Sequence, residues 1–163
     1  MLGNVVDVDE AMMETAMTKE EGSAFFLDFR AALPSVLQGF LLGVFRHMGM
    51  PASVLNMVRT LYHDNSCTLV AGGCRQPGFA IGSGIRQGCP LSPVLFAIAA
   101  DVLLRRIRRL VPSVLVRAYA DDIALIIPQW REEAPRLQRV LQDYAAVSGL
   151  ELNRAKSVWV LLE

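Results

Sequence analysis

The sequence lacks a charge excess of either sign, because 16 basic and 16 acidic residues among its 163 residues cancel to a formal net charge of zero. A neutral chain creates no global positive field that would attract nucleic acid over a distance. The charges are nevertheless clustered. The charged residues within 7–21 are mostly acidic, and five arginines lie close together in the sequence: Arg105, Arg106, Arg108, Arg109 and Arg117. Both clusters are typical of solvated surfaces, and phosphate contact by the arginines is the less favoured alternative.

Cysteine and long hydrophobic runs are also scarce. Three cysteines without CxxC spacing argue against a disulfide framework and a zinc site, and favour a reducing compartment. The N-terminal residues lack a basic region ahead of an apolar core, which argues against a secretory signal. The longest apolar stretch, residues 90–104, is too short to span a bilayer and contains Asp101. We therefore expect an intracellular protein, nuclear or cytoplasmic, that is not secreted and has no membrane partner.

The chain has the length of one domain, and no repeat or linker divides it, so we expect residues 1–163 to form a single unit. Apolar periodicity predicts a helix over residues 4–19. Caps and breakers predict further helices over residues 33–49, 51–63, 93–110 and 131–147: Gly49 and Gly149 as stops, and Pro51 and the Ser92–Pro93 pair as starts. Short apolar runs predict strands over residues 23–29, 114–119, 122–127 and 157–163, with a hairpin within 67–84. This interleaving predicts an α/β (α+β) layer fold: a small mixed or antiparallel sheet with helices packed on one face.

Two adjacent carboxylates, Asp121 and Asp122, interrupt the apolar segment 114–127. An ionised carboxylate left unpaired among apolar residues is costly, so it usually neutralises or finds a cation. Because side chains alternate along a strand, we expect Tyr119 and Asp121 to share one face, unless a tight turn re-aims them. Asp28 ends another predicted strand. If the strands are neighbours, Asp28 and Asp121 converge in an oxygen-rich site of the kind that Mg²⁺ prefers.

Two such ions, roughly 3.5–4 Å apart, can clamp the attacking and leaving oxygens of a phosphoryl transfer. The alternative is that Ala120, Asp121 and Asp122 simply form a turn, which aspartate side chains stabilise. The residues alone favour the turn. The glycine-containing loop 82–88 fits neither common phosphate-binding fingerprint, so by itself it indicates little.

Four stretches, taken together, favour the metal site over the simple turn. They are AFFLDFRAALPSV at 24–36, GIRQGCPLSPVLFAIAADVLL at 84–104, YADD at 119–122 and GLELNRAKS at 149–157. Together they resemble the palm of reverse transcriptases, most closely those of non-long-terminal-repeat retrotransposons. The resemblance implies that residues 1–163 form one partial reverse transcriptase domain with a polymerase palm fold, into which a helix over residues 1–22 leads. It also implies that most of the fingers and all of the thumb are absent.

The implied activity is DNA synthesis on an RNA or DNA template with a primer. The primer 3′-hydroxyl attacks the α-phosphorus of a deoxynucleoside triphosphate, and pyrophosphate leaves. By resemblance, Asp28 and Asp121 hold two Mg²⁺ or Mn²⁺ ions, Asp122 assists, and Lys156 meets the departing pyrophosphate. The residues expected to bind nucleotide and template are Leu33, Arg86, Gln87, Gly88 and Tyr119.

Two features leave alternatives open. Leu33 stands where the family has an aromatic residue that excludes the ribose 2′-hydroxyl, so we expect looser exclusion of ribonucleotides. Because the fingers and thumb segments are missing as partners, an alternative is a truncated or decayed fragment without turnover, at most a weak nucleic-acid or protein binder. A third alternative is the palm of an RNA-dependent RNA polymerase, against which Ala120, in place of glycine, argues.

Overall fold

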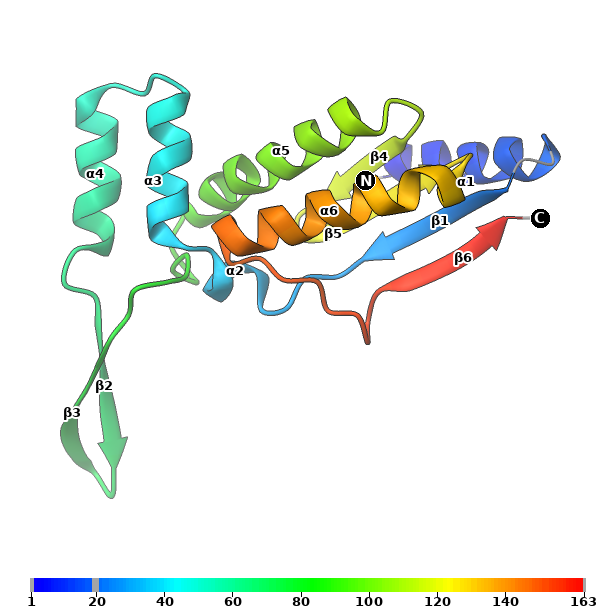
Figure 1. Cartoon of the computed structure of the whole chain (residues 1–163). Helices are drawn as coiled ribbons and strands as arrows, with labels where there is room; N and C mark the ends of the chain where they lie inside the picture. The colour runs from blue at the N-terminus through cyan, green and yellow to red at the C-terminus, as the bar shows by residue number, and fades with distance from the viewer. Residues whose placement is uncertain (1, 19–20, 163) are drawn as a thin grey trace.

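The computed structural model describes residues 2–18 and 21–162 (Figure 1). The helices are α1 (Leu2–Met17), α2 (Ala32–Ser35), α3 (Gln38–His47), α4 (Ala52–Tyr62), α5 (Ser92–Leu110) and α6 (Trp130–Ser148). The strands are β1 (Gly22–Leu27), β2 (Ser66–Ala71), β3 (Cys74–Ala80), β4 (Leu115–Tyr119), β5 (Asp122–Ile127) and β6 (Val158–Leu162). The predicted elements are confirmed with small shifts at their ends. Residues 19 and 163, the limits of two of them, lie outside the described residues.

The predicted helix over residues 33–49 is the exception, because the structure divides it into α2 and α3. Val36 and Leu37 are extended, with ψ angles of 120° and 124°. Their backbone groups bond elsewhere: the amide of Leu37 donates to the carbonyl of Ser148 at 2.8 Å, and the carbonyl of Val36 accepts from the amide of Gly84 at 2.8 Å. These long-range bonds replace the helical ones, and they tie the chain after α2 to the end of α6.

The main sheet has the order β4-β5-β1-β6, and each neighbouring pair is antiparallel. The sheet is therefore wholly antiparallel, which is one of the two predicted forms. Strand β1 is central, and its Leu27 pairs with Ile123 of β5. At the same end of the sheet, Tyr119 of β4 pairs with Asp122 of β5. The ends of three strands thus meet where the acidic residues lie.

Helices α5 and α6 cover one face of the sheet, as predicted, and enclose the main core. Buried side chains of this core include Leu103, Ile107, Leu125 and Tyr144, and the Tyr144 hydroxyl donates to the Ala99 carbonyl at 2.9 Å. Burial of this phenol raises its pKa.

The opposite face of the sheet is not bare. Helix α1 packs there against a smaller cluster formed by Ala24, Ile126 and Leu162. Helices therefore lie on both faces of the sheet (Figure 1), a correction to the expectation of one covered face. Because α1 covers only part of its face, Phe26 stays 38% exposed and Tyr119 56% exposed. The uncovered part lies beside the acidic residues.

Strands β2 and β3 form a separate two-stranded hairpin that projects from the body of the molecule (Figure 1). Nearly all of its side chains are exposed. Within the described ranges, no helix is long and apolar enough to cross a bilayer.

Candidate active site

A tight turn between β4 and β5 carries the two adjacent acids. Tyr119 and Asp122 close it as a cross-strand pair, so the loop itself consists of Ala120 and Asp121. Residues paired across strands present their side chains on the same face. The structure therefore groups Tyr119 with Asp122, not with Asp121 as simple alternation would have it. The turn begins directly after Tyr119, and it re-aims the side chains that follow.

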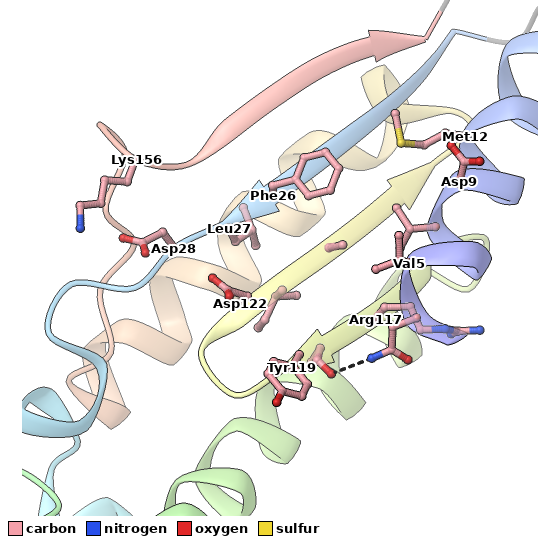
Figure 2. A pocket seen from close by; sticks show the side chains of 15 residues that line it. Val5, Asp9, Met12, Phe26, Leu27, Asp28, Arg117, Tyr119, Asp122 and Lys156 are labelled. Carbon is pink, nitrogen blue, oxygen red and sulfur yellow. Dashed lines mark hydrogen bonds between the residues drawn. The ribbon is translucent and has the colours of Figure 1, made fainter. Parts of the chain in front are cut away.

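Asp28 lies directly opposite this turn. It follows Leu27, the last residue of β1, and Leu27 pairs with Ile123, so Asp28 and Asp122 occupy facing ends of neighbouring strands. Both line a cavity of about 700 Å³ between α1 and the sheet. Figure 2 shows Asp28, Asp122 and Lys156 gathered at one end of this cavity, which we call the helix-side cavity.

The segment 149–157 holds Asp28 in place through backbone contacts. The Asp28 amide donates to Ser157 Oγ at 3.1 Å, and its carbonyl accepts from the amide of Asn153 at 2.8 Å. The same turn bonds the amide of Lys156 to the carbonyl of Asn153 at 3.1 Å, which fixes the lysine at the cavity rim. A sequence element more than 120 residues downstream therefore positions the first acid.

Asp121 lines a different cavity, of about 890 Å³, which we call the loop-side cavity. Leu33, Gln87 and Gly88 line it as well. Ala118 borders both cavities, so they adjoin at the β4–β5 turn. Four of the predicted site residues thus share the loop-side cavity, and four others, Asp28, Tyr119, Asp122 and Lys156, share the helix-side cavity.

Backbone bonds join the loop before α5 to the segment after β1. The amide of Ile85 donates to the carbonyl of Leu33 at 2.8 Å. Gly84 has a φ of +94°, and a Cβ there would lie 2.8 Å from the carbonyl oxygen of Pro34. A side chain at residue 84 would force these two segments apart, so glycine is required for the loop-side cavity to form.

Arg86 lies outside both cavities. Its guanidinium donates to the side chain of Asn65, next to the β2–β3 hairpin, and its carbonyl accepts from the hydroxyl of Ser92. Tyr62 is buried close to the Arg86 backbone, and burial raises the pKa of its phenol. Arg86 therefore faces the surface at the base of the hairpin, while Gln87 and Gly88 face the loop-side cavity.

The site carboxylates have the donor chemistry that a hard cation needs. The side chains of Asp28, Asp121 and Asp122 make no hydrogen bond or ion pair within residues 2–18 and 21–162, so their oxygens are available. Across the same ranges, no three acidic, histidine or cysteine side chains group into a complete metal site. Mg²⁺ commonly takes only one or two protein carboxylates, with waters and substrate phosphates completing its shell. The facing pair Asp28 and Asp122 fits that pattern.

Helix α1 contributes contacts that the sequence did not predict. Asn4 Nδ2 donates to the Ala118 carbonyl at 3.2 Å (Figure 2), and Arg117 Nε pairs with Asp7 Oδ2 at 2.8 Å. Both contacts fasten β4 just before the acidic turn. No local pattern indicates them, because more than 100 residues separate the partners.

Replacing Ala120 with glycine is expected to stabilise the protein by about 1 kcal/mol. Ala120 has a φ of +53°, and the left-handed region costs a residue with a Cβ about 1–2 kcal/mol, which exceeds the roughly 0.5–1 kcal/mol entropic cost of glycine. Thermal denaturation should show a midpoint about 2–4 °C higher. Ala118→Gly, in the extended β4 strand, is the matched control and should lower the midpoint. A lower midpoint for Ala120→Gly would contradict the strain at this turn.

Comparison with known protein families gives a match over most of the chain. A family model described as reverse transcriptase (RNA-dependent DNA polymerase) matches residues 4–162. The transposon TX1 uncharacterized 149 kDa protein of Xenopus laevis is 27% identical over 144 residues, which cover 83% of this chain and 11% of that protein. The Pol polyprotein of a type-1 retrotransposable element R2 of Popillia japonica is 25% identical over 163 residues, covering 95% of this chain and 27% of that protein.

The RNA-directed DNA polymerase from the mobile element jockey of Drosophila funebris is 28% identical over 152 residues, covering 88% of this chain and 16% of that protein. Among solved structures, telomerase from Candida tropicalis, in complex with a fragment of telomeric RNA, superposes with a TM-score of 0.77 at 12% identity. That match covers 99% of this chain and 29% of the telomerase chain. The chain thus spans between 11% and 27% of the length of these curated relatives, and it shares the fold of the telomerase region.

Proposed function

This chain belongs to the reverse transcriptase (RNA-dependent DNA polymerase) family, and we propose that it forms the palm of such an enzyme and transfers deoxynucleotides to a primer 3′-hydroxyl on a nucleic-acid template. One observation carries the proposal. Asp28 and Asp122 stand at facing ends of neighbouring strands. Asp121, in the adjoining β4–β5 turn, lines the loop-side cavity. Three unpaired carboxylates at one end of the sheet have no evident structural role, because none of their side chains bonds within the described part of the chain.

Asp28, Asp121 and Asp122 are the residues that would hold Mg²⁺ or Mn²⁺. When bound, two such ions lower the pKa of the primer 3′-hydroxyl and neutralise the charge that develops on the triphosphate. The protein contributes mainly by holding the reacting groups in position, because phosphoryl transfer needs little covalent chemistry from side chains.

The loop-side cavity is where we propose that the nucleotide and its template partner bind. Gln87 and Gly88 form one wall, and Gly88 has open space where a Cβ would stand, which allows a base pair to approach the backbone. Leu33 forms another wall, where it would contact the sugar. Arg86, at the cavity's outside, would contact the template strand, and Tyr119 would lie against the primer end.

Lys156 stands at the rim of the helix-side cavity, near Asp28 (Figure 2). Its ammonium group can donate a proton from Nζ to an oxygen of the departing pyrophosphate, or stabilise that charge directly. Either role suits a lysine that is exposed and free of ion pairs with the described acids. Asp28 and Lys156 line the same cavity, so a pyrophosphate that leaves beside Asp28 would lie close to the lysine.

Primer extension tests the proposal. The purified chain should add deoxynucleotides to a labelled primer on an RNA template in Mg²⁺ or Mn²⁺, and Asp121→Ala should not. Preference for ribonucleotides would instead support an RNA-dependent RNA polymerase. No incorporation by the wild-type chain, alone or within a longer relative carrying this palm, would contradict catalysis and favour a fragment that only binds nucleic acid or protein.

Replacing Leu33 with phenylalanine is expected to sharpen selection against ribonucleotides. Leu33 lines the loop-side cavity and is half-buried, so a larger rigid ring would narrow the space beside the sugar. Steric discrimination of this kind is worth about 1–3 kcal/mol, or roughly 10–200-fold. The measurement is the ratio of kcat/KM for a deoxynucleotide to that for its ribonucleotide, with Leu33→Met as the control of similar volume. An unchanged ratio in Leu33→Phe would contradict the proposed contact between Leu33 and the sugar.

A further inference from the structure

Four arginines surround a cavity on the helical layer that shares no lining residue with the two cavities at the acidic turn. The cavity has a volume of about 420 Å³ and lies between α5 and α6. Arg106 and Arg109 line it from α5, and Arg136 and Arg139 line it from α6. The described residues contribute no acid to its lining, and Leu110 and Val140 supply apolar surface. We call it the arginine groove.

The spacing of the arginines makes two short rows. Within each helix the two residues are three positions apart, so they lie on the same face, about 4.5 Å apart along the axis at 1.5 Å per residue. Helices α5 and α6 run side by side over the sheet (Figure 1). Each row therefore lines its own wall of the same groove.

The charges of the arginine groove are only half compensated. Arg106 pairs with Asp143 at 2.6 Å, and Arg136 pairs with Glu133 at 3.0 Å. Arg109 and Arg139 have no ion-pair partner in the part of the chain that the structure describes. Like charges gathered around one cavity repel one another, and apolar walls focus their field. An anion bound between them would relieve this repulsion.

The balance of charge differs between the helices, because α5 and α6 together carry seven arginines against four acids. Helix α1 carries Asp7, Asp9, Glu10 and Glu14, and it packs on the opposite face of the sheet. The zero net charge of the chain therefore hides a separation of charge between the two faces. The groove also lies at the other end of β4 from the acidic turn, and a five-residue strand covers roughly 15 Å.

We propose that the arginine groove binds the phosphate backbone of a single-stranded nucleic acid, at a site separate from the catalytic cavities. Guanidinium groups match phosphate oxygens in a bidentate geometry, and two rows of them offer contacts to successive phosphates of one strand. Each row is about one helical turn long and the cavity between them is only about 420 Å³, which suits a few successive phosphates of one strand. The choice of nucleic acid as the anion rests on the proposed polymerase function, whose template or transcript would supply the strand.

The test measures binding without catalysis. Fluorescence anisotropy of a labelled single-stranded RNA is followed in EDTA, without nucleotides, across a series of salt concentrations. Arg109→Gln/Arg139→Gln removes the two uncompensated charges, both on exposed side chains, so the fold should be retained. Arg46→Gln/Arg75→Gln is the matched control, because these arginines are also exposed, form no ion pair with the described acids and lie away from the groove.

The groove variant should bind with about 20-fold higher Kd at 0.1 M salt, and the slope of log K against log salt should fall by about 1.4, since each phosphate contact on a single strand contributes about 0.7. The control should change neither value by as much. Equal effects in both variants, or none in the groove variant, would overturn the proposal. Tighter, groove-dependent binding of a duplex of equal length would overturn the single-strand assignment.

The outcome separates this proposal from the polymerase proposal. Primer extension by the wild-type chain is measured beside RNA binding, so each proposal has its own readout. If the groove variant binds RNA as the wild type does while the wild type extends primers, the groove proposal alone is overturned. If the groove variant binds RNA more weakly, as expected, but the wild type does not extend primers, the proposed catalysis alone is contradicted.

Discussion

Replacing Asp28 with asparagine is expected to lower nucleotide incorporation by about 10³-fold or more, with little change in stability. Asparagine keeps the shape of the side chain and removes its charge. The Asp28 carboxylate bonds to nothing in the described structure, so the fold loses no contact, and only backbone groups of Asp28 hold it in place. A carboxylate that holds a catalytic cation contributes several kcal/mol to the transition state, and about 4 kcal/mol corresponds to 10³-fold.

Two measurements check this expectation. Single-nucleotide incorporation reports the loss of rate, and titration with Mn²⁺, followed by electron paramagnetic resonance, reports cation binding whether or not the chain turns over. Asp64→Asn is the matched control, because Asp64 is exposed, lies outside both cavities and has a φ of +50° that asparagine accepts. Full Mn²⁺ binding together with more than a tenth of the wild-type rate in Asp28→Asn would falsify the assignment of Asp28.

The same titration distinguishes the two adjacent acids. Asp122 shares the helix-side cavity with Asp28, whereas Asp121 lies in the loop-side cavity. We therefore expect Asp122→Asn to weaken Mn²⁺ binding in the absence of nucleotide. Asp121→Asn should act mainly once a triphosphate is bound.

Replacing Gly149 with alanine is expected to destabilise the protein by about 3 kcal/mol or more. Gly149 ends α6 with a φ of +79°, where a Cβ would lie 2.3 Å from the carbonyl oxygen of Ser35 and 3.0 Å from Leu37 Cγ. The left-handed conformation alone costs about 1–2 kcal/mol with a side chain. Relief of the clash would pull α6 from the α2–α3 break and lose the bond from the Leu37 amide to the Ser148 carbonyl, worth about 1 kcal/mol.

Thermal denaturation should show a midpoint about 6–12 °C lower for Gly149→Ala, at roughly 2–4 °C per kcal/mol for a chain of this size. Gly43→Ala is the matched control. Gly43 lies inside α3 with open space around it, so alanine there should raise stability by up to about 1 kcal/mol. A midpoint for Gly149→Ala within about 2 °C of the wild type would show that α6 can shift without cost.

Most of the secondary structure was predictable because local patterns govern it. The Ser92–Pro93 start and the Gly149 stop located α5 and α6, and apolar runs located β1, β4 and β5. The break at Val36 and Leu37 was not predictable, because the bonds that replace the helical ones come from Gly84 and Ser148, far away in the sequence. The packing of α1 on the second face likewise depends on residues from three distant strands.

The sequence predicts which residues form the candidate site, but it does not predict how they are grouped in space. The four sequence stretches identified the family, which the family model over residues 4–162 confirms. Their order says nothing about which acids share a cavity. That depends on the register of β1 with β5 and on the two-residue turn after Tyr119, which place Asp122 with Asp28 in the helix-side cavity and Asp121 in the loop-side cavity.

The family, the α/β class, most of the elements and the candidate acids follow from the amino-acid sequence alone, because motif spacing, helix caps and apolar runs are local properties of the chain. The two cavities, the support of Asp28 by residues 153 and 157, and the arginine groove appear only in the folded chain. Each of these joins residues that lie far apart in the sequence. Their proximity arises from strand register and helix packing, which set distances that no local pattern encodes.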